Sequence, residues 1–210
     1  MKSAVLVVLA ASIALGRSGC GGPSAPTPNP SPTSSPSPTV TPYPPGVPNA
    51  PAFGNIAHAT GLERASGRGT VLVSVQGNVT LAGLVTPGSS WYYAFADPKS
   101  TIPVRLFLWN VLPDGRVESS TTLDVLRLDL VDLTPRLVVD SSEAVRLGRR
   151  YGAESFVQRY PECWVELNYR YVGRLAVCQM IFTAGRCRMG PVIINAESGE
   201  LLSRTLNCPD

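Results

Sequence analysis

The sequence predicts an α+β fold over residues 53–210, in which an antiparallel sheet packs against a helix. Residues 70–76 alternate apolar and polar side chains, which is the two-residue period of a half-buried strand. Ala144, Leu147 and Tyr151 recur at helical spacing and share one face of a helix. Further strand patterns follow this helix at short intervals, so we expect an antiparallel meander with one face covered by the helix.

Each predicted element has local signals in the sequence. Asp140 is placed to act as a helix N-cap, and Glu143 stands at the capping-box spacing from it. Gly152 is expected to end the first part of this helix, with a further turn or two over residues 153–160. A short helix is predicted over residues 55–64. Strands are predicted over residues 70–76, 78–85, 90–96, 104–109, 126–133, 164–170, 174–182, 188–195 and 200–204.

The N-terminal fifty residues have a different composition from the rest of the chain. Twelve of the 20 prolines lie between Pro23 and Pro51, and residues 21–62 contain no Asp, Glu, Lys or Arg. Proline, serine and threonine provide little to bury, so residues 20–52 are predicted to be an extended linker that reaches on the order of 100 Å. The alternative interpretation is a proline-rich ligand for an aromatic groove.

Residues 1–19 have the pattern of a secretory signal peptide. A basic start precedes the uncharged apolar run 4–15, which is shorter than the roughly 20 residues of a membrane span. The sequence Ser18-Gly19-Cys20 resembles the end of a bacterial lipobox, although Arg17 stands where that motif carries an aliphatic residue. We therefore expect a lipid on Cys20, a membrane partner through that lipid, and a location in the bacterial cell envelope. Plain secretion and an uncleaved anchor are the alternatives.

The cysteine count and the charge agree with export. The chain has five cysteines, and lipidation of Cys20 leaves four that are expected to form two disulfides, with all three pairings open: Cys163, Cys178, Cys187 and Cys208. No Cys-x-x-Cys pair occurs, so no metal site is predicted. Removal of Lys2 and Arg17 with the signal peptide lowers the net charge from +3 to about +1, which argues against a nucleic-acid partner.

No arrangement of residues indicates an enzyme. His58 is the only histidine and stands beside the linker, and no Gly-x-Ser-x-Gly motif or recognisable pair of acids occurs. We therefore expect no catalytic residue and no cofactor, with an envelope hydrolase as the alternative. Aromatic side chains that could line a binding face, or that alternatively pack in the core, are Trp91, Tyr93, Trp164 and Tyr169.

A short internal repeat suggests two related halves, residues 53–135 and 136–210. In each half an apolar strand ends at an asparagine, Asn110 or Asn195, and a turn containing Gly115 or Gly199 then opens another strand. Because asparagine and glycine are common in turns, a chance match is the alternative explanation.

The second half resembles the PepSY-like domains of bacterial envelope proteins. The resemblance is carried by Asp140-Ser141-x-x-Ala144 and by Asn195-Ala196-Glu197-Ser198-Gly199-Glu200-Leu201, where Asn195 and Ser198 replace the Asp and Thr usual in that family. It implies a helix packed on an antiparallel sheet, sometimes in tandem, with roles in restraining peptidases or in sensing, and no catalytic residues. The expected function is protein or peptide binding by a tethered lipoprotein; a purely structural spacer is the other alternative.

Overall fold

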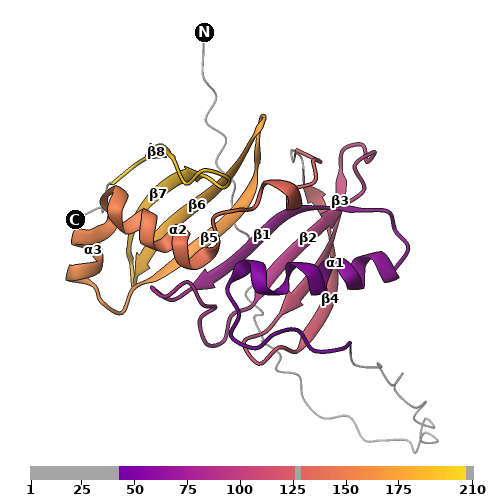
Figure 1. The fold of residues 1–210 in the computed structure, drawn as a ribbon, viewed down its shortest axis with the longest axis horizontal. Coiled ribbons are helices and arrows are strands. Elements are labelled where there is room, and N and C mark those ends of the chain that lie inside the picture. The colour runs from indigo at the N-terminus through magenta and orange to yellow at the C-terminus, as the bar shows by residue number, and fades with distance from the viewer. Residues whose placement is uncertain (1–42, 126–128, 207–210) are drawn as a thin grey trace, which may run out of the picture. The chain divides into compact units, whose positions relative to one another are not determined.

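The computed structural model describes residues 43–125 and 129–206, which form one eight-stranded antiparallel sheet with helices on one face (Figure 1). The strand order is β4-β3-β2-β1-β5-β6-β7-β8. The strands are β1 Val71–Val79, β2 Trp91–Ala96, β3 Val104–Val111, β4 Val117–Val125, β5 Trp164–Val172, β6 Leu175–Ala184, β7 Cys187–Asn195 and β8 Leu201–Arg204. The α+β prediction, with a helix packed on an antiparallel sheet, is confirmed.

Three α-helices and three shorter helical turns complete the fold. The α-helices are α1 Ile56–Ala65, α2 Ser141–Gly148 and α3 Glu154–Arg159. The 3₁₀ turns are η1 Ala52–Asn55 and η2 Thr134–Arg136, and the π-helical turn η3 Arg149–Ala153 joins α2 to α3.

The same order of elements occurs twice along the chain. In each case a helical segment precedes four consecutive antiparallel strands, and the first strands of the two sets, β1 and β5, pair with each other at the centre of the sheet. The two segments of the sequence repeat fall in equivalent hairpins, β3–β4 and β7–β8. Gly115 and Gly199 both take a positive φ there, of 84° and 76°, which is the conformation that favours glycine in a turn.

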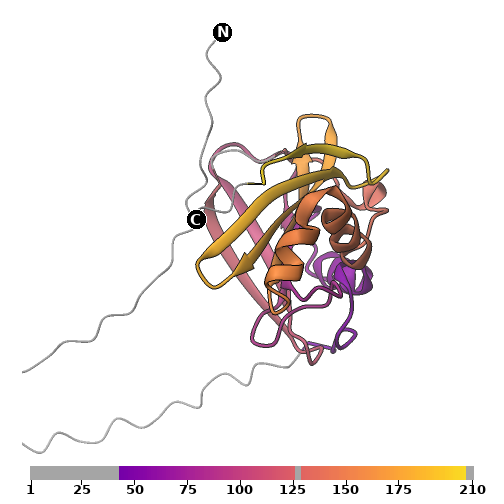
Figure 2. The same cartoon turned by 90° about the vertical axis from the view of Figure 1, so that its left-hand side faces the viewer.

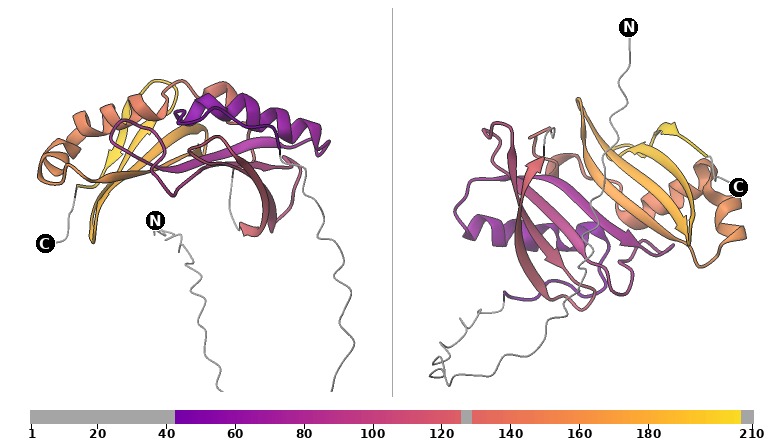
Figure 3. Two further views of the ribbon diagram at one scale, coloured as in Figure 1. Left: turned by 90° about the horizontal axis from the view of Figure 1, so that it is seen from below. Right: turned by 180° about the vertical axis from the view of Figure 1, so that it is seen from behind.

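The helices lie along one face of the sheet, and the sheet bends away from them at both ends, so that the opposite face is concave (Figures 2 and 3). The largest side chains buried on the helix side come from β2, β5 and β6: Trp91, Tyr93, Phe95, Tyr169 and Phe182. A smaller apolar cluster lies at one end of the first three strands: Val73, Ala94, Ala96, Val104 and Leu106. The central part of the concave face has no helix over it.

The chain just before α1 links the two sets of elements. The Ala52 N–H donates to the Ser141 Oγ at the start of α2 (2.9 Å), and the Tyr93 hydroxyl donates to the Ala52 carbonyl (2.7 Å). The Phe53 ring packs edge-on against Tyr169 of β5, with ring centroids 5.3 Å apart. Residues 52–53 therefore contact β2 of the first set and both α2 and β5 of the second.

The helix predicted from Asp140 is confirmed in its start and its break. Asp140 is the N-cap of α2, and its carboxylate accepts from the Ser141 N–H at 2.6 Å. Glu143 does not complete a capping box, because its carboxylate instead accepts from the Arg146 guanidinium one turn later (2.7 Å). Gly152 breaks the helix with a φ of 135°, and α3 follows it.

Two strand predictions are wrong. Residues 78–85 do not form a separate strand, because β1 continues through Gly77 to Val79 and a turn follows. Gly77 leaves room for the Trp91 indole: a Cβ atom at this position would lie 2.6 Å from the indole Cε3. The strand predicted over 126–133 is also misplaced, because the strand in this part of the chain is β4, Val117–Val125. Residues 126–128 lie outside the described residues. Leu133 lies in the core, and its N–H donates to the Leu72 carbonyl (2.8 Å).

Candidate functional site

The candidate site is a row of polar side chains that crosses the concave face of the sheet. Antiparallel registers place these residues opposite one another on five adjacent strands: Asn110 on β3, Tyr92 on β2, Gln76 on β1, Asn168 on β5 and Gln179 on β6. We call this set the central row. Residues directly opposite in register project to the same face of a sheet. Tyr92 belongs to the concave face because Trp91 and Tyr93, on either side of it, are buried beneath the helices.

Internal hydrogen bonds fix the central row but use only part of its bonding capacity. The Gln76 NH₂ group donates to the Ser74 Oγ (3.1 Å), and Ser74 in turn donates to the Asn168 Oδ1 (3.2 Å). The Gln179 Oε1 accepts from the Arg170 guanidinium (3.2 Å). Within the described residues, no hydrogen bond engages the Gln76 carbonyl oxygen or the NH₂ groups of Asn168 and Gln179. A carboxamide has one acceptor oxygen and two donor hydrogens, so the row presents both kinds of group.

A second row lies one step along the strands and consists of Asn78, Glu166 and Ile181. Glu166 is its one charged residue, and both carboxylate oxygens accept from the Arg188 Nη2, at 2.7 and 2.6 Å. This ion pair neutralises Glu166. The centre of the concave face is therefore polar mainly through amides. The charged residues beside the central row are Arg170 on β5, whose guanidinium donates to neutral Gln179, and Glu118 on β4, opposite Asn110.

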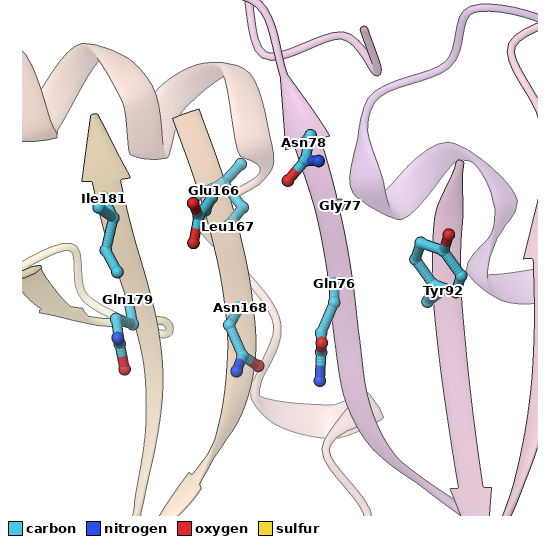
Figure 4. A pocket seen from close by; sticks show the side chains of 9 residues that line it. All are labelled: Gln76, Gly77, Asn78, Tyr92, Glu166, Leu167, Asn168, Gln179 and Ile181. Carbon is cyan, nitrogen blue, oxygen red and sulfur yellow. The ribbon is translucent and has the colours of Figure 1, made fainter. Parts of the chain in front are cut away.

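The two rows enclose a shallow hollow with a volume of about 210 Å³ (Figure 4). Figure 4 shows Gln76, Asn168 and Gln179 at one level on β1, β5 and β6, with Tyr92 at the far side on β2. Pockets for drug-sized ligands usually have volumes of roughly 300–1,000 Å³. The hollow therefore fits one side chain or a short part of a larger ligand, rather than a whole small molecule.

Most of the aromatic residues predicted to bind are in the core instead. Trp91, Tyr93 and Tyr169 are at most 1% exposed and lie beneath the helices. Successive side chains of a strand point to opposite faces of the sheet, and these three point to the face that the helices cover. Trp164 is half-buried, lies opposite Thr183 and belongs to the same set of alternate β5 residues as Glu166 and Asn168, which face the concave side. Tyr92, between Trp91 and Tyr93, is 40% exposed on the concave face. Sequence reasoning missed the four carboxamides of the central row.

The predicted pair of disulfides is wrong for two of the four cysteines. Cys163 and Cys178 are buried free thiols, and burial raises the pKa of Cys178 to about 12. Cys178 lies opposite Tyr169, six residues along β5 from Cys163, so the two are separated by roughly 20 Å. A disulfide needs Cα atoms within about 7 Å. Cys187 is disulfide-bonded, whereas Cys20 and Cys208 lie outside the described residues.

The ionisable residues that could suggest catalysis have structural partners. The His58 Nε2 lies 3.0 Å from the Pro44 carbonyl oxygen, which requires this nitrogen to carry the proton and donate. Glu63 of α1 is 2% exposed and accepts from three neighbours: Arg68, Thr70 and the indole of Trp109. In residues 43–125 and 129–206, no group of three His, Cys, Asp or Glu side chains is arranged to hold a metal ion.

Glu63 lines one of the larger hollows beside the sheet, with a volume of about 480 Å³, but its carboxylate is not available there. Its two oxygens receive four hydrogen bonds, of which the Arg68 Nη2 and Thr70 Oγ1 contacts are the shortest, at 2.6 Å. A carboxylate saturated in this way is held as an ion and cannot act as a proton acceptor for a ligand.

Comparison with known proteins leaves the chain without an assigned relative. No family model, no curated protein and no solved structure matches it. The functional argument therefore rests on the sequence and on the geometry of the concave face.

Proposed function

We propose that the protein is a non-enzymatic, lipid-anchored binding protein of the bacterial cell envelope, which receives a protein or peptide partner on its concave sheet face. The single observation that carries this proposal is the central row, an uncovered set of polar side chains on five adjacent strands with unused hydrogen-bonding groups. Polar side chains and a half-exposed tyrosine are typical of recognition surfaces that adapt to a protein partner.

A position in the envelope is supported by the N-terminal sequence. A lipid on Cys20 and the proline-rich residues that follow it, up to residue 42, would hold the folded residues at a distance from a membrane. Residues 43–52, predicted as part of the linker, instead pack on the fold: the Gly46 N–H donates to the Gly115 carbonyl (2.8 Å), and Ala50 is buried. None of the helices within the described part of the chain is long and apolar enough to cross a membrane. The lipid is therefore the anchor that we propose.

The anchor has a direct test. We expect the mature protein from a bacterial host to begin at Cys20 and to carry the mass of its acyl chains, and Cys20→Ser to abolish that mass and release the protein from membranes. Mass spectrometry of the N-terminal peptide makes the measurement. An unmodified N-terminus downstream of Cys20 would contradict the proposal.

The repeated order of elements supports the proposal of two tandem PepSY-like halves. The features in favour are a helical segment followed by four antiparallel strands in each half, and the turn at Asn195, whose Oδ1 accepts from the backbone N–H groups of Glu197 and Ser198 (2.8 and 3.2 Å). On this proposal the partner is restrained or sensed rather than chemically changed.

Site-specific photo-crosslinking tests whether the concave face is the docking surface. A photoreactive residue in place of Tyr92 is expected to form a covalent adduct with one defined partner in intact cells. The same residue in place of Gln158, an exposed residue of α3, serves as the control for random encounters, because α3 belongs to the helix layer. Equal adducts from both positions, or none from Tyr92, would refute the proposal.

A further inference from the structure

We infer that the ligand of the concave face is an uncharged, extended polypeptide segment, which lies along the central row and is recognised through its backbone. This inference rests on the proposed binding function and specifies the chemistry of the partner. Its basis is the alignment of four carboxamides on four of the five strands of the row, with Tyr92 on the fifth: Asn110, Gln76, Asn168 and Gln179.

The dimensions of the central row match a short extended chain. Asn110 on β3 and Gln179 on β6 are four strand spacings apart, which is about 19 Å at the usual distance between strands. An extended polypeptide rises about 3.3 Å per residue, so about six residues cover the row. Such a segment would cross the strands, in contrast to a strand that adds to a sheet edge.

The bonding groups of the row complement those of a peptide unit. A side-chain carboxamide and a backbone amide are the same functional group, each with an N–H donor and a C=O acceptor. The Gln76 carbonyl is open to a backbone N–H, while the NH₂ groups of Asn168 and Gln179 are open to backbone carbonyls. Recognition of this kind depends little on the side chains of the ligand.

The charge on the face indicates that the segment is neutral. Glu166, the one charged residue that lines the hollow, is paired with Arg188, so no unpaired charge lines the hollow to attract an ionic side chain. Arg170 donates to the neutral Gln179 and keeps its positive charge, but it does not line the hollow. Desolvating an ion against neutral amides costs free energy that no counter-ion offsets. Half-buried Ile181 and Ile193 flank the row and offer apolar contact to the ligand's side chains.

A buried, unpaired polar atom at the end of the row is consistent with a missing ligand. The Asn110 Oδ1 has no hydrogen-bond partner in the described structure. An unsatisfied buried acceptor costs free energy, and native proteins usually satisfy such groups. A small rotation of the Asn110 amide toward a bound backbone N–H would remove that cost.

A neutral glycan is the competing ligand, and the composition of the row disfavours it. Binding to the apolar faces of sugar rings depends on aromatic platforms, and Tyr92 is the one aromatic residue in the central row. Trp164 stands four residues away from Asn168 on β5, away from the row.

Backbone methylation provides the test. Full-length protein is titrated with short uncharged peptides of Ser, Thr, Asn and Val, with the same peptides carrying N-methyl groups on alternate residues, and with a neutral oligosaccharide. Binding is followed by fluorescence anisotropy. We expect the unmodified peptides to bind and N-methylation to weaken binding by about tenfold or more, since each N-methyl group removes a backbone donor and its hydrogen bond.

Variants locate the effect on the face. Gln76→Ala and Asn168→Ala are each expected to weaken peptide binding about five- to tenfold, and Gln158→Ala on α3 to leave it unchanged. Gln76 is exposed, so its variant is expected to fold even if Asn168→Ala does not. Equal affinity for the N-methylated peptides, or binding of the oligosaccharide alone, would overturn the inference. If Tyr92 crosslinks a partner in cells while the peptides fail to bind, the inference is wrong and the proposed function stands; if both fail, both are wrong.

Discussion

Replacement of Glu63 by alanine is expected to destabilise the protein by about 3–5 kcal/mol, the usual cost of breaking a buried ion pair by removing one partner. The carboxylate is 2% exposed and accepts from the Arg68 Nε and Nη2, the Thr70 Oγ1 and the Trp109 Nε1. Alanine would leave the indole N–H buried without an acceptor and would remove the hydrogen bond that joins α1 to Trp109 of β3. Urea unfolding followed by circular dichroism measures the change.

Glu154→Ala is the matched control. Glu154 also accepts two hydrogen bonds from an arginine, Arg149, but both side chains are partly exposed, so its loss is expected to cost no more than about 1 kcal/mol. Equal losses of unfolding free energy at Glu63 and Glu154 would show that the buried hydrogen bonds of Glu63 stabilise the protein no more than an exposed ion pair does.

The same network predicts a dependence on pH. Burial alone would raise the pKa of Glu63, but hydrogen bonds from Arg68, Thr70 and Trp109 outweigh it, and the pKa lies below its ordinary value. A carboxylate with a lowered folded-state pKa binds its proton more readily in the unfolded state. Its stabilising contribution is therefore complete above the unfolded-state pKa of about 4.3 and is lost as the pH falls through the folded-state value. Glu63→Gln should remove this acid-dependent component of the unfolding free energy, which titration of stability against pH would reveal.

Local signals in the sequence predicted the elements whose ends carry distinctive residues. The helix at Asp140 was predictable because the cap, the apolar spacing and the break at Gly152 all lie within a few residues. Strand β4 was not predictable from the sequence, because an edge strand of serines and threonines lacks the alternation of apolar and polar residues. Its residues Ser119, Ser120 and Thr121 are all exposed. The alternating LRLDLVDL segment follows β4, and its described residues 129–133 are not a strand although their sequence alternates like one.

The candidate site shows where local reasoning stops. Each amide of the central row lies between two buried neighbours in its strand, as exposed Gln76 does between Val75 and Gly77. This alternation of polar and buried positions is visible in the sequence. The alignment of Gln76 with Asn168 depends on the pairing of β1 with β5, across more than ninety residues of chain. No short-range pattern sets that register. Sequence reasoning likewise did not separate the two faces of β2: Trp91 and Tyr93 lie in the core, and Tyr92 between them is exposed.

Ser141→Ala is expected to cost about 2–5 kcal/mol, a large effect for the loss of one oxygen atom. The Ser141 hydroxyl is fully buried; it donates to the Gly83 carbonyl (2.7 Å) and accepts from the Ala52 N–H (2.9 Å). Alanine would leave both backbone groups without a partner inside the protein, and each buried unsatisfied group costs about 1–3 kcal/mol. Because these contacts join the chain before α1 to the start of α2, we also expect faster amide hydrogen exchange at Ala52.

The neighbouring serine provides the control for this prediction. Ser142 lies in the same helical turn but is exposed, so Ser142→Ala changes the same atom without uncovering a buried group and should alter stability by no more than about 0.5 kcal/mol. If the two variants unfold at the same urea concentration, water or a shifted backbone must satisfy Gly83 and Ala52 in the absence of the hydroxyl. The two sets of elements would then be held together at residues 52–53 by apolar contacts, such as Phe53 against Tyr169, rather than by hydrogen bonds.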